Sequence, residues 1–187
     1  MIIKLNDEKD NLGIKGKDLL TRPIADRFVP RVISMLKNMK DESEPVEFSF
    51  EEIQTADTSF IDQLIIVKVL ESMQKKKLKK LGVFLSGLSP STHDNAGSVF
   101  GKKEIPILVK VNSNKFELFG HLENNLARVL RVLMIRKQLR AVEIRKEQGV
   151  DINVASTKLY DLYKKGLATR KEKITEKGRE YIYFALF

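Results

Sequence analysis

The sequence predicts an α/β fold, with a mixed sheet flanked by helices, followed by a smaller α+β part. Over residues 1–120, short apolar stretches typical of strands alternate with amphipathic helical stretches, whereas residues 121–187 predict helices first and a hairpin last. The charge changes at the same boundary. Residues 121–187 hold 15 Lys and Arg against 8 Asp and Glu, while residues 1–120 hold 19 against 17. We therefore expect two domains, 1–120 and 121–187.

The bulk composition excludes several classes of protein. The 187 residues are 42% hydrophobic and 32% charged, as in an ordinary soluble globular protein. No apolar run approaches the ~20 residues of a membrane span, and the N-terminus does not have the pattern of a signal peptide. The absence of cysteine removes disulfides and thiolate zinc sites and favours the cytoplasm. The net charge of +9, concentrated in residues 121–187, indicates a polyanion partner for that part.

The first domain begins with a predicted strand, "MIIKLN", and a glycine-containing connection, "NLGIKGKD". A helix is predicted over "LLTRPIADRFVPRVISMLKNM" because its apolar residues recur at helical spacing. Thr21 is its expected N-cap, and Pro23 lies in the first turn, where a missing N–H costs little. Pro30 lies inside the pattern, so we expect a kink or a later start.

The remaining elements of this domain follow from short apolar runs. A strand is predicted at "VEFSF", and a loop, "IQTADTSF", leads into a helix over residues 60–77 capped by Asp57 or Thr58. Two buried-type strands are predicted at "LGVFLSGL" and "ILVKV". Between them, "SPSTHDNAGSVFGKKEIP" predicts a long polar loop with at most one short helix. The order β-α-β-α-β-loop-β indicates a layered α/β unit.

The stretch "VEFSFEEIQTADTSFIDQL" resembles the STAS-like fold, named for sulfate transporters and anti-sigma-factor antagonists. Upstream, "GKDLLTRPIADRF" resembles the first helix of bacterial STAS-like domains of unassigned function. The resemblance covers about residues 1–120 and implies a module for sensing, partner binding or dimerisation. In the antagonists, a partner kinase phosphorylates the hydroxyl after the aspartate. Thr58 is the matching residue and Ser59 follows it, but Phe60 stands where antagonists usually have glycine.

Two interpretations of these hydroxyls stay open. A phosphate on Thr58 or Ser59 would meet free N–H groups and the positive end of the helix dipole, although Asp57 and Asp62 would repel it. Alternatively, Thr58 and Ser59 only cap the helix.

The second domain begins with two predicted helices, "ENNLARVLRVLMIRKQ" and "LRAVEIRKEQG", the latter ended by Gly149. A third helix is predicted from a cap at Asn153 to about Lys165, ended by Gly166. A hairpin follows in "LATRKEKITEKGREYIYFALF", with "TEKG" as its turn.

The two faces of the third helix differ in chemistry. One face carries apolar residues at i, i+4 and i+7, namely Ala155, Leu159 and Leu162, which should pack on the first two helices. Small and polar groups on the other face suit close approach to base edges and phosphates. They are Asn153, Ser156, Thr157, Tyr160 and Lys164.

Three helices followed by a basic hairpin resemble the winged helix-turn-helix. The matching pattern is "L-x-x-L-x-x-x-G-L-x-x-R" and a final "G-R-x-Y-x-Y", within about residues 123–187. The resemblance implies that the third helix enters the major groove of DNA and that the hairpin touches the backbone or the minor groove. The alternative is a winged helix that binds protein.

These patterns predict a cytoplasmic, prokaryotic DNA-binding protein that regulates transcription without a cofactor. We expect double-stranded DNA as partner, a protein partner through the STAS-like domain, and a homodimer on two half-sites. Base-proximal contacts are predicted for Asn153, Ser156, Thr157 and Tyr160. Phosphate contacts are predicted for Lys158, Lys164, Arg170, Lys171, Lys173, Lys177 and Arg179. The alternatives are a partner-switching protein controlled at Thr58 or Ser59, and a scaffold subunit of a larger complex.

Motifs of catalysis are not found, so we do not expect an enzyme. His93 and His121 lie far apart in sequence, and His93 has only Asp94 beside it, so no metal site is expected. The stretch "GSVFGKK" has three residues between its glycines, not four, and no Ser or Thr after the lysine, unlike a phosphate loop. The sequence has no nucleophile elbow, zinc-protease motif or dinucleotide fingerprint. The run "KKKLKK" is expected to be a solvated helix end.

Overall fold

A five-stranded sheet organises the N-terminal part of the chain. The computed structural model describes residues 1–41, 43–113, 115–175 and 178–187. The strands are β1 (Ile2–Lys4), β3 (Val46–Ser49), β5 (Val83–Ser86), β6 (Ile107–Lys110) and β7 (Phe116–Phe119), in the order β1-β3-β5-β6-β7. The first four are parallel and β7 is antiparallel to β6. This confirms the predicted α/β class with a mixed sheet.

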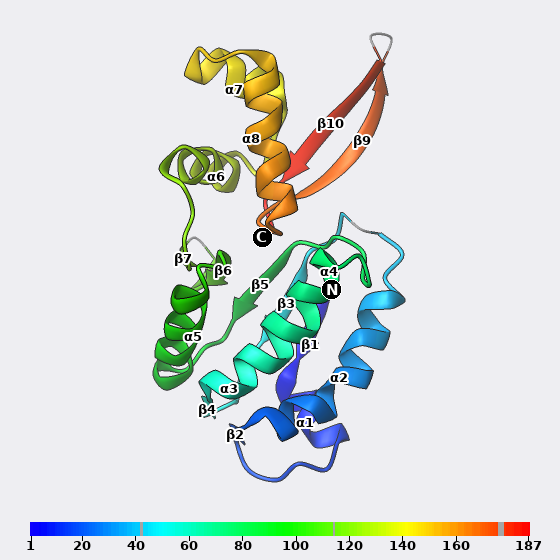
Figure 1. The fold of residues 1–187 in the computed structure, drawn as a ribbon, viewed down its shortest axis with the longest axis vertical. Helices are drawn as coiled ribbons and strands as arrows, with labels where there is room; N and C mark the ends of the chain where they lie inside the picture. Colours follow the sequence, from blue (N-terminus) through cyan, green and yellow to red (C-terminus); the bar gives the residue numbers. More distant parts are fainter. Residues whose placement is uncertain (42, 114, 176–177) are drawn as a thin grey trace.

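Helices cover one face of this sheet (Figure 1). They are α1 (Leu5–Asn11), α2 (Arg22–Lys37), the continuous helix α3 (Thr58–Ile61), η1 (Asp62–Leu70) and α4 (Glu71–Gln74), and α5 (Pro90–Lys103). Two short parallel strands, β2 (Asp18–Leu19) and β4 (Thr55–Ala56), pair apart from the main sheet. The consecutive residues Leu64, Ile65 and Ile66 are all fully buried, because η1 is enclosed by α2 and the sheet.

The start of the chain differs from the prediction in three ways. The helix α1 was not expected: it begins within the predicted strand "MIIKLN" and ends at the first residue of the predicted connection. Thr21 stands at the N-cap of α2, but its side chain makes no capping hydrogen bond and its φ is 74°. The helix starts at Arg22 and runs through Pro30, so a later start was wrong; Phe28 and Val32 are fully buried on the same face. Packing therefore outweighs the backbone hydrogen bond that proline cannot donate.

The predictions for the middle of the chain were wrong at two elements. The expected polar loop is largely α5, whose start is capped by Ser89: the Ser89 Oγ accepts the Thr92 N–H at 3.3 Å. Buried residues at helical spacing, Ala96 and Phe100 among them, hold α5 on the sheet. The strand β7 occupies "FELF", where no strand was expected, and ends just before residue 120.

The C-terminal part consists of three helices and a small sheet. The elements are α6 (Asn124–Arg136), β8 (Gln138–Leu139), α7 (Ala141–Gln148), α8 (Ile152–Lys164), β9 (Thr169–Thr175) and β10 (Gly178–Phe184). The three strands are antiparallel in the order β8-β10-β9. The helices and the hairpin were predicted, whereas β8 was not. The N-cap of α8 is Asp151, whose Oδ1 accepts the Asn153 N–H at 2.8 Å, so Asn153 lies in the first turn.

The C-terminal part packs on the face of the sheet that the helices leave open. Phe84 and Leu108 point away from the helices and join a second buried cluster with side chains of residues 122–187. The rings of Phe84 and Phe187 are 4.7 Å apart, and the Val83 N–H donates to the Gly166 carbonyl at 3.1 Å. Figure 1 shows α1 and α7 at opposite ends of the molecule, with the β9–β10 hairpin projecting away from the main sheet. The position of α8 is thus tied to β5.

Replacing Gly120 by alanine should destabilise the connection between the two parts. Gly120 has φ +75°, and a Cβ there would lie 2.0 Å from the Ile105 carbonyl oxygen. We expect Gly120→Ala to lower the free energy of unfolding by about 2 to 4 kcal/mol, through left-handed strain and overpacking, measured by urea denaturation.

Gly101→Ala is the matched control, because a Cβ at this position in α5 meets nothing within 4 Å. It should leave stability unchanged or raise it by up to ~1 kcal/mol, as alanine does in a helix. Equal urea midpoints for Gly120→Ala and the wild type would contradict the close approach at Ile105.

Candidate functional site

The helix α8 has one buried face and one open face. Ala155, Leu159 and Leu162 are fully buried against α6 and α7, which confirms the packing face that their spacing predicted. On the other face, Asn153, Ser156 and Thr157 are exposed, and Tyr160 is 41% exposed. The four side chains predicted to lie near bases therefore share a surface that solvent reaches.

We did not select two further exposed side chains from the sequence, one on α8 and one just past its end. Val154 is 45% exposed although it is apolar, and Lys165 is exposed just past the end of the helix. The signal for Val154 was present, because it precedes Thr157 by three residues and so shares its side of the helix. An exposed methyl group of this kind suits contact with the thymine methyl in the major groove.

Arg170 lies in a cluster formed by tyrosines of α8 and the hairpin. Its Cζ is 4.3 Å from the Tyr163 ring centre, 4.2 Å from that of Tyr181 and 5.2 Å from that of Tyr160. Burial raises the pKa of the Tyr183 hydroxyl, and its hydrogen bond to Arg170 opposes that rise. These contacts join α8 to β9 and β10.

The two predicted phosphate-binding lysines of α8 have partners within the protein. The Lys164 Nζ is 2.8 Å from Asp161 Oδ1 and lies over the Tyr160 ring at 5.0 Å, and the hydrogen bond with Asp161 raises the pKa of Lys164. The Lys158 Nζ donates to Gln148 Oε1 at 2.9 Å, toward the end of α7. Lys164 is exposed on the open face of α8, whereas Lys158 is half-buried beside α7.

The basic residues of the hairpin divide between its two faces. Lys171 and Lys173 pair with Ile182 and Glu180, so they point away from the face that carries Arg170. The Lys171 Nζ lies 3.3 Å from Asp41 Oδ2 of the N-terminal part. The hydrogen bonds from Ser43 lower the pKa of Asp41, and Lys171 adds to this.

One more predicted phosphate contact, Arg179, lies near the tip of the hairpin. The Arg179 Nε lies 3.4 Å from Glu172 Oε1, on the same side of the hairpin as Arg170. Lys177 lies outside the described residues.

The hydroxyls of Thr58 and Ser59 border a shallow cavity of about 170 Å³. Thr58 is exposed and Ser59 is half-buried. Two cationic side chains line the same cavity, Arg22 from α2 and Lys102 from α5. The structure thus brings both candidate phosphorylation sites close to positive charge.

The two acidic residues expected to repel a phosphate there already have partners. The Asp57 Oδ1 accepts the Phe60 N–H at 2.7 Å and its Oδ2 accepts the Thr21 N–H at 3.0 Å. The buried Asp62 carboxylate lies 3.3 Å from the Arg22 guanidinium and 2.6 Å from the Lys103 ammonium. Their negative charge is therefore partly balanced, which weakens the predicted repulsion.

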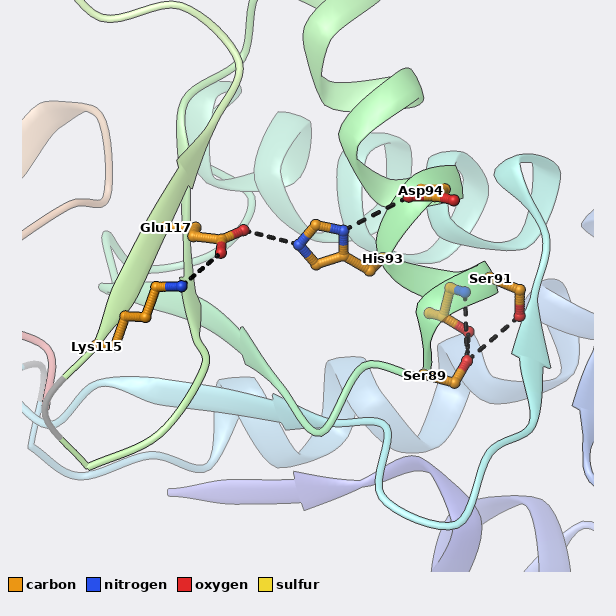
Figure 2. A network of polar contacts seen from close by, with 7 residues as sticks. Ser89, Ser91, His93, Asp94, Lys115 and Glu117 are labelled. Atoms are coloured by element: carbon orange, nitrogen blue, oxygen red, sulfur yellow. Dashed lines mark hydrogen bonds and ion pairs between the residues drawn. The ribbon is translucent and has the colours of Figure 1, made fainter.

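His93 belongs to a polar network between α5 and β7 (Figure 2). Its Nε2 lies 2.7 Å from Glu117 Oε2, its Nδ1 lies 3.7 Å from Asp94, and its ring meets Phe119 edge to face at 4.9 Å. The hydrogen bond from His93 is the main cause that lowers the pKa of Glu117, and Lys115 at 3.7 Å contributes. The figure also shows the hydroxyls of Ser89 and Ser91 that face each other at 3.4 Å at the start of α5.

This network ties a helix to the edge of the sheet and does not gather ligands. In the part of the chain that the structure describes, no group of three or more His, Asp or Glu side chains is placed to hold a metal ion. Among the same residues, no helix is both long and apolar enough to cross a membrane.

Comparison of the chain with protein-family models, with curated proteins and with solved structures gave no match.

Glu117→Gln should reduce stability in a pH-dependent way. The folded-state pKa of Glu117 lies below its ordinary value of 4.5, so the stabilisation is complete above 4.5 and is lost as the pH falls through the lowered value. Because both side chains are about a third exposed, solvent screening limits the effect to roughly 0.5 kcal/mol. We expect a lower urea midpoint for the variant at neutral pH and equal midpoints in strong acid.

Asp94→Asn serves as the comparison, because this carboxylate is farther from the ring and 89% exposed. It should change the midpoint less than Glu117→Gln at neutral pH. A constant difference between Glu117→Gln and the wild type at all pH values would show that ionisation of Glu117 does not stabilise the fold.

Proposed function

We propose that this chain is a DNA-binding regulator of transcription in which α8 enters the major groove. The observation that carries the proposal is the open face of α8, where Asn153, Ser156, Thr157 and Tyr160 reach solvent next to a projecting hairpin. Asn, Ser, Thr and Tyr side chains donate and accept hydrogen bonds at short reach, which suits base edges and phosphates.

The order of elements supports the resemblance to the winged helix-turn-helix. The chain passes from α6 through the short strand β8 to α7 and α8, and then into the hairpin, with β10 between β8 and β9. A helix held by two others and followed by a hairpin can present its N-terminal half to a groove while the hairpin approaches the backbone. The excess of basic residues in 121–187 provides the long-range attraction to DNA.

The N-terminal part is proposed as a STAS-like module for sensing, partner binding or dimerisation in the cytoplasm. Parallel strands with helices on one face support this resemblance. Its contact with the C-terminal part, through Phe84 and the Val83–Gly166 hydrogen bond, provides a physical route by which a partner could affect α8. A homodimer would place two α8 helices on two half-sites about 34 Å apart.

The full chain should bind a random-sequence fluorescent duplex with an affinity that falls steeply as salt rises. Ser156→Glu places a carboxylate on the open face of α8, so we expect binding about tenfold weaker at low salt because the carboxylate repels phosphate. The measurement is fluorescence anisotropy across a salt series.

Ser34→Glu is the matched control, since Ser34 is an exposed residue of α2 and both variants lower the net charge by one. Its affinity should stay within about twofold of the wild type. Equal losses for the two variants would mean that net charge alone acts, and would remove α8 from the interface. No binding by the wild type at low salt would contradict DNA binding.

A second candidate function is a partner switch controlled by phosphorylation at Thr58 or Ser59. It is favoured by the cavity in which these hydroxyls lie with Arg22 and Lys102. A phosphate there would form charge-assisted hydrogen bonds with the two cations and change the surface that a partner meets. The alternative was that Thr58 and Ser59 only cap the helix, but the capping side chain is that of Asp57, whose Oδ1 accepts the Phe60 N–H.

Mass spectrometry of protein purified from its native source should find a phosphate on Thr58 or Ser59 if this candidate holds. The double variant Thr58→Ala, Ser59→Ala should then lose the modified species completely. Ser98, an exposed hydroxyl on the α5 side of the same cavity, should stay unmodified. Protein that carries no phosphate on either residue, under conditions where a partner is bound, would contradict the switch.

A further inference from the structure

The four tyrosines of the sequence gather around one arginine. Tyr160 and Tyr163 come from α8, and Tyr181 and Tyr183 come from β10. Arg170, the second residue of β9, lies within 4.3 Å of a ring centre from each of these two elements. The cluster is therefore the direct side-chain link between the helix and the hairpin.

The contacts of Arg170 differ from those of a phosphate-binding arginine. A guanidinium binds phosphate through N–H groups directed outward into solvent, whereas the cation here is packed among aromatic rings and is half-buried. Rings at such distances stabilise a cation through their negative faces, and the interaction strengthens as water is excluded. The guanidinium group of Arg170 therefore packs between α8 and the hairpin.

We propose that Arg170 is a positioning residue, which fixes the hairpin against α8 and does not itself bind DNA phosphate. The proposal rests on the DNA-binding function proposed above, since the geometry that Arg170 maintains is that of the open face and the hairpin. Through Tyr160, whose ring also lies under the Lys164 ammonium at 5.0 Å, it orients a side chain of that face.

Arg170→Lys is an informative substitution because it keeps the positive charge and removes the planar guanidinium group. An ammonium is a compact, strongly hydrated point charge that cannot stack between rings as a guanidinium does. If Arg170 bound phosphate, Arg170→Lys would retain most of the affinity, and Arg170→Gln would lower the slope of log K against log salt by about 0.9. For a positioning residue, both variants lose about tenfold in affinity with the slope unchanged.

A second measurement does not depend on DNA. Because the sequence has no tryptophan and these are its four tyrosines, the tyrosine band in near-ultraviolet circular dichroism reports on this cluster alone. Arg170→Lys and Arg170→Gln should both lose most of that band while the far-ultraviolet signal of the helices is kept. Lys173→Gln removes the same charge from the opposite face of β9 and should leave the band intact.

Tyr181→Leu covers the case in which the Arg170 variants do not fold. It keeps an apolar side chain on β10 and the charge of Arg170, and removes one ring contact at 4.2 Å. A positioning role predicts weaker binding with an unchanged salt slope, whereas a phosphate contact predicts unchanged binding.

The outcomes separate this proposal from the proposed function. A wild type that does not bind DNA, together with a tyrosine band lost on substitution, overturns DNA binding and leaves Arg170 as the link between α8 and the hairpin. A tyrosine band that survives both Arg170 substitutions overturns the positioning role even if DNA is bound. Affinity retained by Arg170→Lys, with a lower slope for Arg170→Gln, also overturns it.

Discussion

The arrangement of the whole molecule depends on the burial of the open face of the sheet by the C-terminal part. Helices cover one face only, and Phe84 and Leu108 would be exposed on the other without the side chains of residues 122–187. Burial of apolar surface contributes about 25 cal/mol for each Å² removed from water. The hydrophobic effect that stabilises each core therefore also opposes separation of the two parts. The second cluster thus includes residues of both parts of the chain, although charge and element order change between them.

The positive charge of residues 121–187 is partly balanced by acidic side chains from both parts of the chain. The excess of positive charge lies in residues 121–187, but several of its cations have acidic neighbours, among them Lys164 with Asp161 and Arg179 with Glu172. Lys171 even faces Asp41 of the other part. Exposed pairs of this kind are weak and salt-sensitive, so they compete only weakly with a polyanion. In the proposed function, the basic surface would therefore attract DNA at long range, and the small polar residues of α8 would determine what fits closely.

Much of the fold was predictable because burial leaves a periodic signal. Ala155, Leu159 and Leu162 repeat at helical spacing, and the parallel strands are short apolar runs. α5 escaped prediction because its glycines and polar residues obscure a weak pattern, although Ser89 and Pro90 are typical of a helix start. β8 has two residues and forms only because β10 lies beside it. The ring contacts of Arg170 were equally hidden, since basic composition cannot distinguish a cation among rings from one in solvent.

The hydrogen bond between Val83 and Gly166 has a mechanical consequence. It lies at the first residue of β5 and just past the end of α8, so it fixes the C-terminal end of α8 to the sheet, whereas Ala155 near the N-terminal end packs on α6 and α7. The 13 residues of α8 span roughly 20 Å at 1.5 Å per residue. A tilt of about 5° at this point, made together with α6 and α7, would displace Asn153 by roughly 2 Å, more than half the length of a hydrogen bond. The displacement is largest at the N-terminal end of α8, where the short side chains of Asn153 and Ser156 lie.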